Sequence, residues 1–186
     1  MYLFSGTQTP ARYDGKTTLI KDAIRVGTYI HPVHKWQLAV DEAKLSHWVE
    51  TFKKMKEAGV TVPFVGVKDS GGGDHTVNSS TTMSYVKDMF VADGVLSFTV
   101  EVDEKDKEFA KKINQVSIGT KGTFTDGKGN VYKDAIQHIA LTPTPIVPGQ
   151  EGFKELALAT GVDEVLVLEE PEKPSEKPPE KPVVPA

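Results

Sequence analysis

The sequence predicts an α+β fold, in which an antiparallel β-barrel or a strongly curved sheet carries helices packed on its outside. Two observations lead to this fold class. Short runs of β-branched and aliphatic residues recur along the chain and are separated by turn signals. Only residues 41–58 and 103–113 have the apolar spacing of helices. Strands that follow one another through short turns pair in the antiparallel sense, and the few helices then pack against the sheet.

The N-terminal part begins with a polar stretch, residues 1–15, which we expect to form an arm. Residues 17–30 are rich in β-branched and aliphatic side chains and predict one or two strands. Residues 41–58 predict the clearest helix, which Asp41 can cap at its start and Gly59 can end. Its apolar residues recur at spacings of three and four and form one stripe: Leu45, Trp48, Val49, Phe52 and Met55.

The middle of the chain predicts a first β-hairpin. A short strand at residues 61–67 and a glycine-rich loop at 68–80 come before it. Residues 82–91 and 95–102 then flank Asp93-Gly94, a pair typical of two-residue hairpin turns. We therefore expect these two strands to be neighbours in the sheet.

A second hairpin follows, with strands at residues 116–124 and 131–141 around the glycine-rich stretch 126–130. The helix predicted at 103–113 lies between the two hairpins. Its inward side chains are expected to be Phe109, Ala110 and Ile113. Regular structure then ends at three prolines: Pro143, Pro145 and Pro148.

The C-terminal part has two sections of different composition. Residues 153–168 could hold a short helix and a strand. Residues 169–186 consist almost entirely of Pro, Glu and Lys, which cannot bury enough surface to offset the entropy of ordering. We expect an extended, disordered tail there. The chain is thus divided into an arm at 1–15, a domain at 16–168 and a tail at 169–186.

Composition limits the classes of function. The 186 residues carry a net charge of −4 and contain no cysteine, which excludes disulfides and thiolate metal sites. No apolar run approaches the ~18 residues of a membrane helix, and no signal-peptide core is expected at the N-terminus. The mild acidity argues against nucleic acid as a partner. No cofactor is expected.

One serine and two histidines form the main candidate site. Ser117 lies between Val116 and Ile118 on a predicted strand, so its side chain points to the opposite face from theirs. His138 lies on the expected partner strand, and His75 follows the glycine cluster in the loop. A serine hydroxyl becomes a nucleophile when a neighbouring base accepts its proton and a third group orients that base.

Pattern alone favours a simpler interpretation of each residue. Ser117 would then be a polar residue on a half-buried strand. His138 would be a core or surface histidine that hydrogen-bonds to the backbone, and His75 would be an exposed loop residue. The remaining histidines suggest no metal site, because Pro32 disfavours a helix that would bring His31 and His34 together.

The ordered set of segments resembles the prohead maturation proteases of tailed phages, a family related in fold to the herpesvirus assemblins. The resemblance runs from about residue 62 to 149. It comprises a strand with a histidine just after it, a strand–Asp-Gly–strand unit at Tyr85–Leu96, and a short helix. The segments Val116–Gly119 and Ile139–Gly149 are similar to the family's nucleophile strand and to the proline-containing segment that follows its barrel.

This resemblance implies an assemblin-like, protease-like domain at residues 16–168. Ser117 matches the nucleophile, His75 the general base and His138 the orienting third member of a Ser-His-His triad. The implied activity is serine endopeptidase cleavage of scaffold and capsid precursor proteins during prohead maturation, with self-cleavage as an option. The implied location is the host cytoplasm, inside the immature prohead, and the tail would link to a scaffold region.

Two other classes of function stay open. The chain could be a structural or scaffold-associated virion protein that has the same fold without catalysis. It could also be a β-rich binding module in which the serine and histidines are incidental. Self-association of the chain is also left open. The protease hypothesis requires Ser117, His75 and His138 to converge on one face of the sheet.

Overall fold

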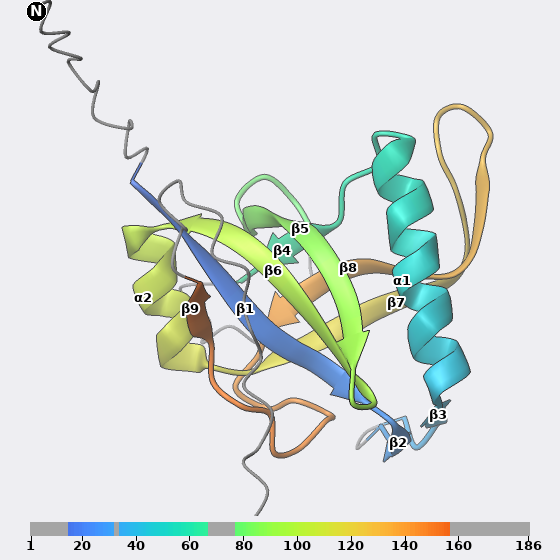
Figure 1. The fold of residues 1–186 in the computed structure, drawn as a ribbon, viewed down its shortest axis with the longest axis horizontal. Helices are drawn as coiled ribbons and strands as arrows, with labels where there is room; N and C mark the ends of the chain where they lie inside the picture. Colours follow the sequence, from blue (N-terminus) through green and yellow to red (C-terminus); the bar gives the residue numbers. More distant parts are fainter. Residues whose placement is uncertain (1–14, 32–33, 67–76, 157–186) are drawn as a thin grey trace, which may run out of the picture.

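The computed structural model describes residues 15–31, 34–66 and 77–156, and these form an α+β fold (Figure 1). The strands are β1 (Lys16–Arg25), β2 (Gly27–Ile30), β3 (Gln37–Val40), β4 (Pro63–Val65), β5 (Thr82–Ala92), β6 (Val95–Asp103), β7 (Val116–Thr125), β8 (Val131–Leu141) and β9 (Lys154–Leu156). The helices are α1 (Glu42–Glu57) and α2 (Glu104–Ile113). Seven strands form one sheet in the order β7-β8-β4-β5-β6-β1-β9, and β2 pairs with β3.

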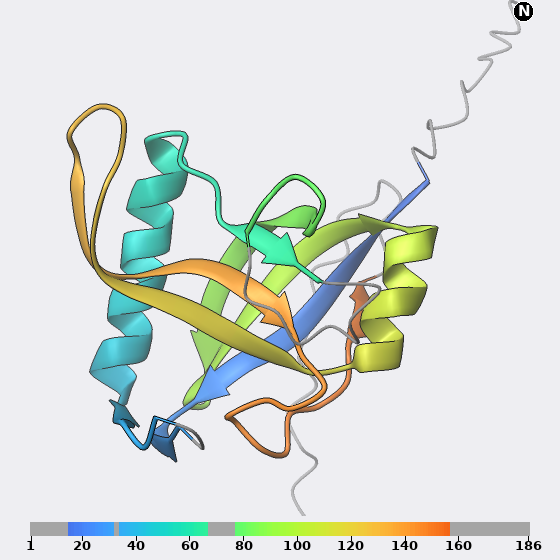
Figure 2. The same ribbon diagram turned by 180° about the vertical axis from the view of Figure 1, so that it is seen from behind.

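The sheet is strongly curved, but the described residues do not close it into a barrel. Strands β1, β5 and β6 lie towards the viewer in Figure 1. Strands β4, β7 and β8 lie towards the viewer in Figure 2, which shows the molecule from the opposite side. Phe64 of β4 and Phe98 of β6 meet in the interior, with ring centroids 5.9 Å apart. The two ends of the sheet are β7 and β9, and no ladder joins them among the described residues.

Each predicted hairpin is present, and one pairing in the sheet differs from the prediction. Strands β5 and β6 pair in the antiparallel sense, as do β7 and β8. Strand β4, however, pairs in parallel with β8, so the sheet is mixed and not wholly antiparallel. Turn signals could not predict this pairing, because β4 and β8 are far apart in the sequence. Their contact fills the junction between the two hairpins.

The predicted stripe of α1 is buried against the sheet, and both ends of the helix are capped. The Asp41 side chain accepts a hydrogen bond from the Lys44 backbone N–H at 2.8 Å. At the other end Gly59 has a positive φ of 83° and Val60 donates to the Met55 carbonyl, which is the Schellman arrangement. Helices α1 and α2 lie on opposite sides of the curved sheet (Figures 1 and 2).

Two short strands were not individually predicted. Strand β3 completes a small hairpin with β2, and β9 falls within residues 153–168, where a helix and a strand were expected. The remainder of that stretch, the arm up to residue 14 and the tail at 169–186 lie outside the described residues.

The side-chain amide of Gln150 connects the two halves of the sheet. Its Oε1 accepts a hydrogen bond from the Val116 N–H at 2.9 Å, and its Nε2 donates to the Val116 carbonyl at 2.7 Å. The same Nε2 lies 3.4 Å from the Ala23 carbonyl of β1. One amide therefore satisfies the first residue of the edge strand β7 and bridges it to β1.

We predict that Gln150→Leu lowers the free energy of unfolding by about 1–3 kcal/mol, because the polar groups of buried Val116 lose their partners. Denaturant unfolding measures this loss, and the Val116 amide should exchange faster with solvent. Gln37→Leu is the control, since Gln37 is exposed on β3. Equal stability of the two variants would contradict the bridging role.

The turn of the β7–β8 hairpin is organised by Asp126. Its carboxylate accepts hydrogen bonds from the backbone N–H groups of Lys128 at 2.8 Å and Asn130 at 3.0 Å. It also accepts from the Asn130 side chain at 2.8 Å and from the Tyr132 hydroxyl at 3.0 Å. These bonds, the Asn130 side chain first, lower the pKa of Asp126 from 3.8 to about 2.

A lowered carboxyl pKa stabilises the folded turn above the pKa of the unfolded chain. We therefore predict that this stabilisation is complete above about pH 4 and is lost as the pH falls towards 2. NMR titration of the carboxyl carbons should place the Asp126 transition well below pH 3.8. As the pH falls, the amide signals of Lys128 and Asn130 should shift in the wild-type chain and stay constant in Asp126→Asn. If they shift in the variant as well, a group other than Asp126 causes the change.

Candidate functional site

Ser117 and His138 lie on neighbouring strands and on one face of the sheet. In the β7–β8 ladder Ser117 is opposite Ala140, and Gly119 is opposite His138. The register between these two rows is regular, with the irregularity coming after Gly119. Because alternate residues of a strand share a face, Ser117 and His138 are diagonal neighbours on the same face. The sequence correctly predicted that they occupy paired strands.

The imidazole of His138 lies directly over Gly119. A Cβ atom at Gly119 would come within 2.0 Å of the His138 Cε1 and within 2.4 Å of its Nε2. No side chain could occupy this position without moving the ring. Gly119 and Gly122 both lie near Ser117 on β7. The structure shows that the space above Gly119 holds the imidazole, whereas nothing lies within 4 Å of a Cβ at Gly122.

A hollow of about 230 Å³ opens beside His138. Its wall includes Met55 and Val60 from the C-terminal end of α1 and the segment that follows. The hollow is also lined by Thr61, Val77, Gln137 and Phe124 of β7. The position of α1 against β8 therefore shapes the hollow. That position is supported by the Lys44–Asp134 ion pair, with its nitrogen and oxygen 2.7 Å apart.

His75 lies outside the described residues, so its position relative to Ser117 and His138 stays a prediction. The described residues on each side of it are informative. Strand β4 runs parallel to β8, with Val65 opposite Ala140, and the chain continues from there through Gly66. Val77, on the other side of the segment that contains His75, lines the hollow beside His138. Val65 thus lies next to the row that contains Ser117, and Val77 lies beside His138.

Ser117 also borders a second, smaller hollow of about 40 Å³. Its lining is mainly apolar and includes Ile24 of β1, Leu38 of β3 and Val147. Ile118, the neighbour of Ser117, contributes as well. The β2–β3 hairpin, which the sequence did not clearly predict, therefore helps to enclose this edge of β7.

A serine nucleophile needs backbone N–H donors for the oxyanion, and the stretch after Leu141 is one candidate for them. The Thr142 N–H donates to the Gln115 carbonyl at 3.0 Å, and the Thr144 N–H lies 3.2 Å from the Thr142 hydroxyl oxygen. Pro143 and Pro145 have no N–H group. In this conformation residues 142–145 thus offer no uncommitted backbone donor.

One buried cation lies near the segment that carries Gln150. Lys21 is 1 % exposed, its Nζ donates to the Glu151 carbonyl, and the Phe153 ring centroid is 5.6 Å away. Desolvation lowers the pKa of Lys21 to about 8, against the opposing effect of nearby Asp22. Neither Lys21 nor Gln150 was predicted from sequence, because their partners are distant along the chain. Glu151 is 130 residues from Lys21, and Val116 and Ala23 are 34 and 127 residues from Gln150.

The other histidines do not join the candidate site. The His34 N–H donates to the His31 Nδ1 at 3.1 Å within the β2–β3 connection. The His47 Nε2 lies 2.9 Å from the Lys133 carbonyl, so His47 helps to dock α1 on β8. Among the residues that the structure describes, no three His, Cys, Asp or Glu side chains gather closely enough to hold a metal ion.

Comparison of the chain with protein-family models, with curated proteins and with solved structures gave no match. The resemblance to prohead maturation proteases therefore stays a prediction from the sequence motifs. Within the described part of the chain, neither helix is long and apolar enough to cross a membrane. The case for the site rests on the geometry of the β7–β8 hairpin.

We predict that Gly119→Ala displaces the His138 ring, because the added methyl group would overlap it. The proton and carbon shifts of the His138 imidazole, measured by NMR, should change clearly. Gly122→Ala is a matched control on the same strand, since a Cβ there meets no atom within 4 Å. Indistinguishable His138 signals in the two variants would show that the ring does not rest on Gly119.

Proposed function

We propose that the chain is a serine endopeptidase that cleaves scaffold and capsid precursor proteins during phage prohead maturation. Ser117 is the nucleophile, His75 the general base and His138 the group that orients the base. One observation carries the proposal. Ser117 and His138 share a face of the β7–β8 hairpin, with the His138 ring seated over Gly119 between them.

The spacing of these two residues suits a three-membered site. Diagonal neighbours across an antiparallel pair have Cα atoms about 7–8 Å apart, so both side chains can reach into one site. A second imidazole beside them would complete the three-membered site that the proposal requires. Val77 lines the hollow beside His138, and His75 is only two residues earlier in the chain. The Cα atoms of His75 and Val77 can be at most about 7 Å apart.

The proposed reaction follows from the roles of the three groups. The Ser117 Oγ attacks the scissile carbonyl carbon while His75 accepts the hydroxyl proton. His75 then gives this proton to the leaving amine as the C–N bond breaks, which leaves an ester on Ser117. Water, deprotonated by His75, hydrolyses the ester and restores the hydroxyl. His138 holds the His75 ring and stabilises its charged form less strongly than a carboxylate would.

The surroundings of Ser117 favour a peptide substrate. Strand β7 lies at an edge of the sheet, where an extended chain could approach its backbone. The small apolar hollow beside Ser117 offers a place for an aliphatic side chain of such a substrate. Capsid and scaffold precursors as the substrate proteins come from the sequence resemblance alone. Slow turnover is expected, which suits a protease that cuts a few sites once during assembly.

We predict that co-expression with a capsid precursor gives processed product with the wild-type chain and none with Ser117→Ala. His138→Ala should process slowly, because loss of the orienting group costs less than loss of the nucleophile. Gel electrophoresis and mass spectrometry of the precursor measure the outcome. Ser46→Ala, which changes an exposed serine on α1, is the control and should process normally.

The result also separates the two main hypotheses. Equal processing by wild type and Ser117→Ala would remove Ser117 from the mechanism. No processing by any variant, with folded protein and intact precursor present, would favour the catalytically inactive virion protein.

A further inference from the structure

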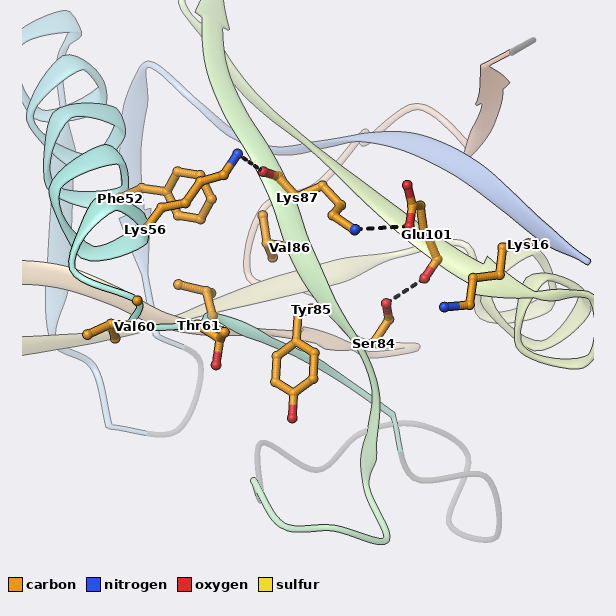
Figure 3. Close-up of a pocket in the computed structure, with 12 residues that line it drawn as sticks. Lys16, Phe52, Lys56, Val60, Thr61, Ser84, Tyr85, Val86, Lys87 and Glu101 are labelled. Carbon is orange, nitrogen blue, oxygen red and sulfur yellow. Dashed lines mark hydrogen bonds and ion pairs between the residues drawn. The ribbon is translucent and has the colours of Figure 1, made fainter. Parts of the chain in front are cut away.

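A groove of about 350 Å³ lies between the C-terminal end of α1 and strands β5 and β6 (Figure 3). Its volume falls within the range of ligand pockets, roughly 300–1,000 Å³. Phe52, Val60 and Val86 give it an apolar surface. Tyr85, whose side chain is labelled in Figure 3, belongs to the same lining and is 48 % exposed. The groove therefore offers apolar and aromatic contacts at the protein surface.

The charged residues around this groove are mainly positive. Lys16, Lys56 and Lys87 line it together with a single carboxylate, Glu101, which leaves a net charge of +2. The Lys87 Nζ lies 3.0 Å from the Glu101 carboxylate, in a pair whose side chains are 55 % and 38 % exposed. The Lys56 Nζ donates to the Lys87 carbonyl at 2.6 Å. An ammonium group has three N–H donors, so Lys56 and Lys87 can each also bind an acidic ligand.

An apolar surface with a positive rim fits an extended peptide whose aliphatic residues are flanked by acids. The chain contains one such segment at residues 163–170. Asp163 and Glu164 precede four aliphatic residues, and Glu169 and Glu170 follow them. We propose that this segment docks in the groove. Its four carboxylates would meet the lysine rim, and its aliphatic residues would cover Phe52 and Val86.

The path of the chain permits this contact. The described residues end in β9, where Leu156 lies opposite Thr18. Because β9 is antiparallel to β1, the chain leaves β9 in the direction of Lys16, which lines the groove. Lys16 is about 7 Å from Thr18 along the strand. The seven residues from Leu156 to Asp163 can span up to roughly 25 Å.

Docking would bring the C-terminal segment close to the candidate active site. Val60 and Thr61 line both this groove and the hollow beside His138. A segment in the groove would thus lie on one side of residues 60–61, with His138 on the other. The proposal does not depend on catalysis, and its test can use an inactive chain.

The test compares ¹⁵N NMR spectra of the full chain, with Ser117→Ala present to prevent self-cleavage. In one variant Asp163→Asn, Glu164→Gln, Glu169→Gln and Glu170→Gln remove the four charges. We expect shifts at the backbone amides of the groove residues Thr61, Ser84, Tyr85 and Lys87, unchanged on tenfold dilution. The control, Glu172→Gln with Glu176→Gln and Glu180→Gln, neutralises acids elsewhere in the tail and should leave these amides unaffected.

A second measurement adds a synthetic peptide of residues 163–170 to the charge-neutralised variant. It should shift the same amides, and Lys16→Glu with Lys87→Glu should weaken its binding by roughly tenfold or more. Lys53→Glu is the control, because Lys53 is on the same helix as Lys56 but outside the groove, and it should leave peptide binding unchanged. Unchanged groove amides in the first comparison would overturn the proposal. Shifts that vanish on dilution would also overturn it, because the occupant would then be a second copy of the chain.

Discussion

The hydrogen bonds of the Gln150 amide to Val116 are the constraint on which the rest of the structure depends. Strand β7 lies at the edge of the sheet, and its first residue would otherwise lack partners on that side. The contact of the same amide with Ala23 holds the two halves of the curved sheet together without a closed ladder. Ser117 follows Val116 directly, so the position of the proposed nucleophile is tied to a segment 33 residues further along the chain.

The candidate site also requires a glycine at position 119, where the His138 imidazole lies over the strand. The β7–β8 register sets His138 opposite Gly119, and the missing Cβ at Gly119 leaves the space that the His138 ring occupies. This arrangement keeps His138 on the same face as Ser117. The placement of Ser117 and His138 therefore depends on the pairing of β7 with β8 and on the small size of Gly119. These two features matter more for it than a hydrogen bond between the two side chains. The hollow beside His138 adds the end of α1 to the same region.

Much of the fold could be predicted because its signals are local. The spacing of Leu45, Trp48 and Phe52 predicted α1, and Asp93-Gly94 predicted the first hairpin. The choice between a barrel and an open curved sheet, and the parallel β4–β8 pair, could not be predicted, since both depend on contacts between distant segments. Gln150 and Lys21 were missed for the same reason. Ser117 and His138 could be placed on paired strands because each lies in an apolar, strand-like run, whereas their catalytic roles and the position of His75 stay predictions.

Fluorophosphonate probes react with serines that a neighbouring base activates, so labelling shows whether Ser117 is such a serine. We expect a single covalent adduct, located at Ser117 by tandem mass spectrometry. The adduct should be absent from Ser117→Ala and should form much more slowly in His75→Ala. An adduct at another serine, or labelling of Ser117 at the same rate in His75→Ala, would rule out the proposed roles of Ser117 and His75.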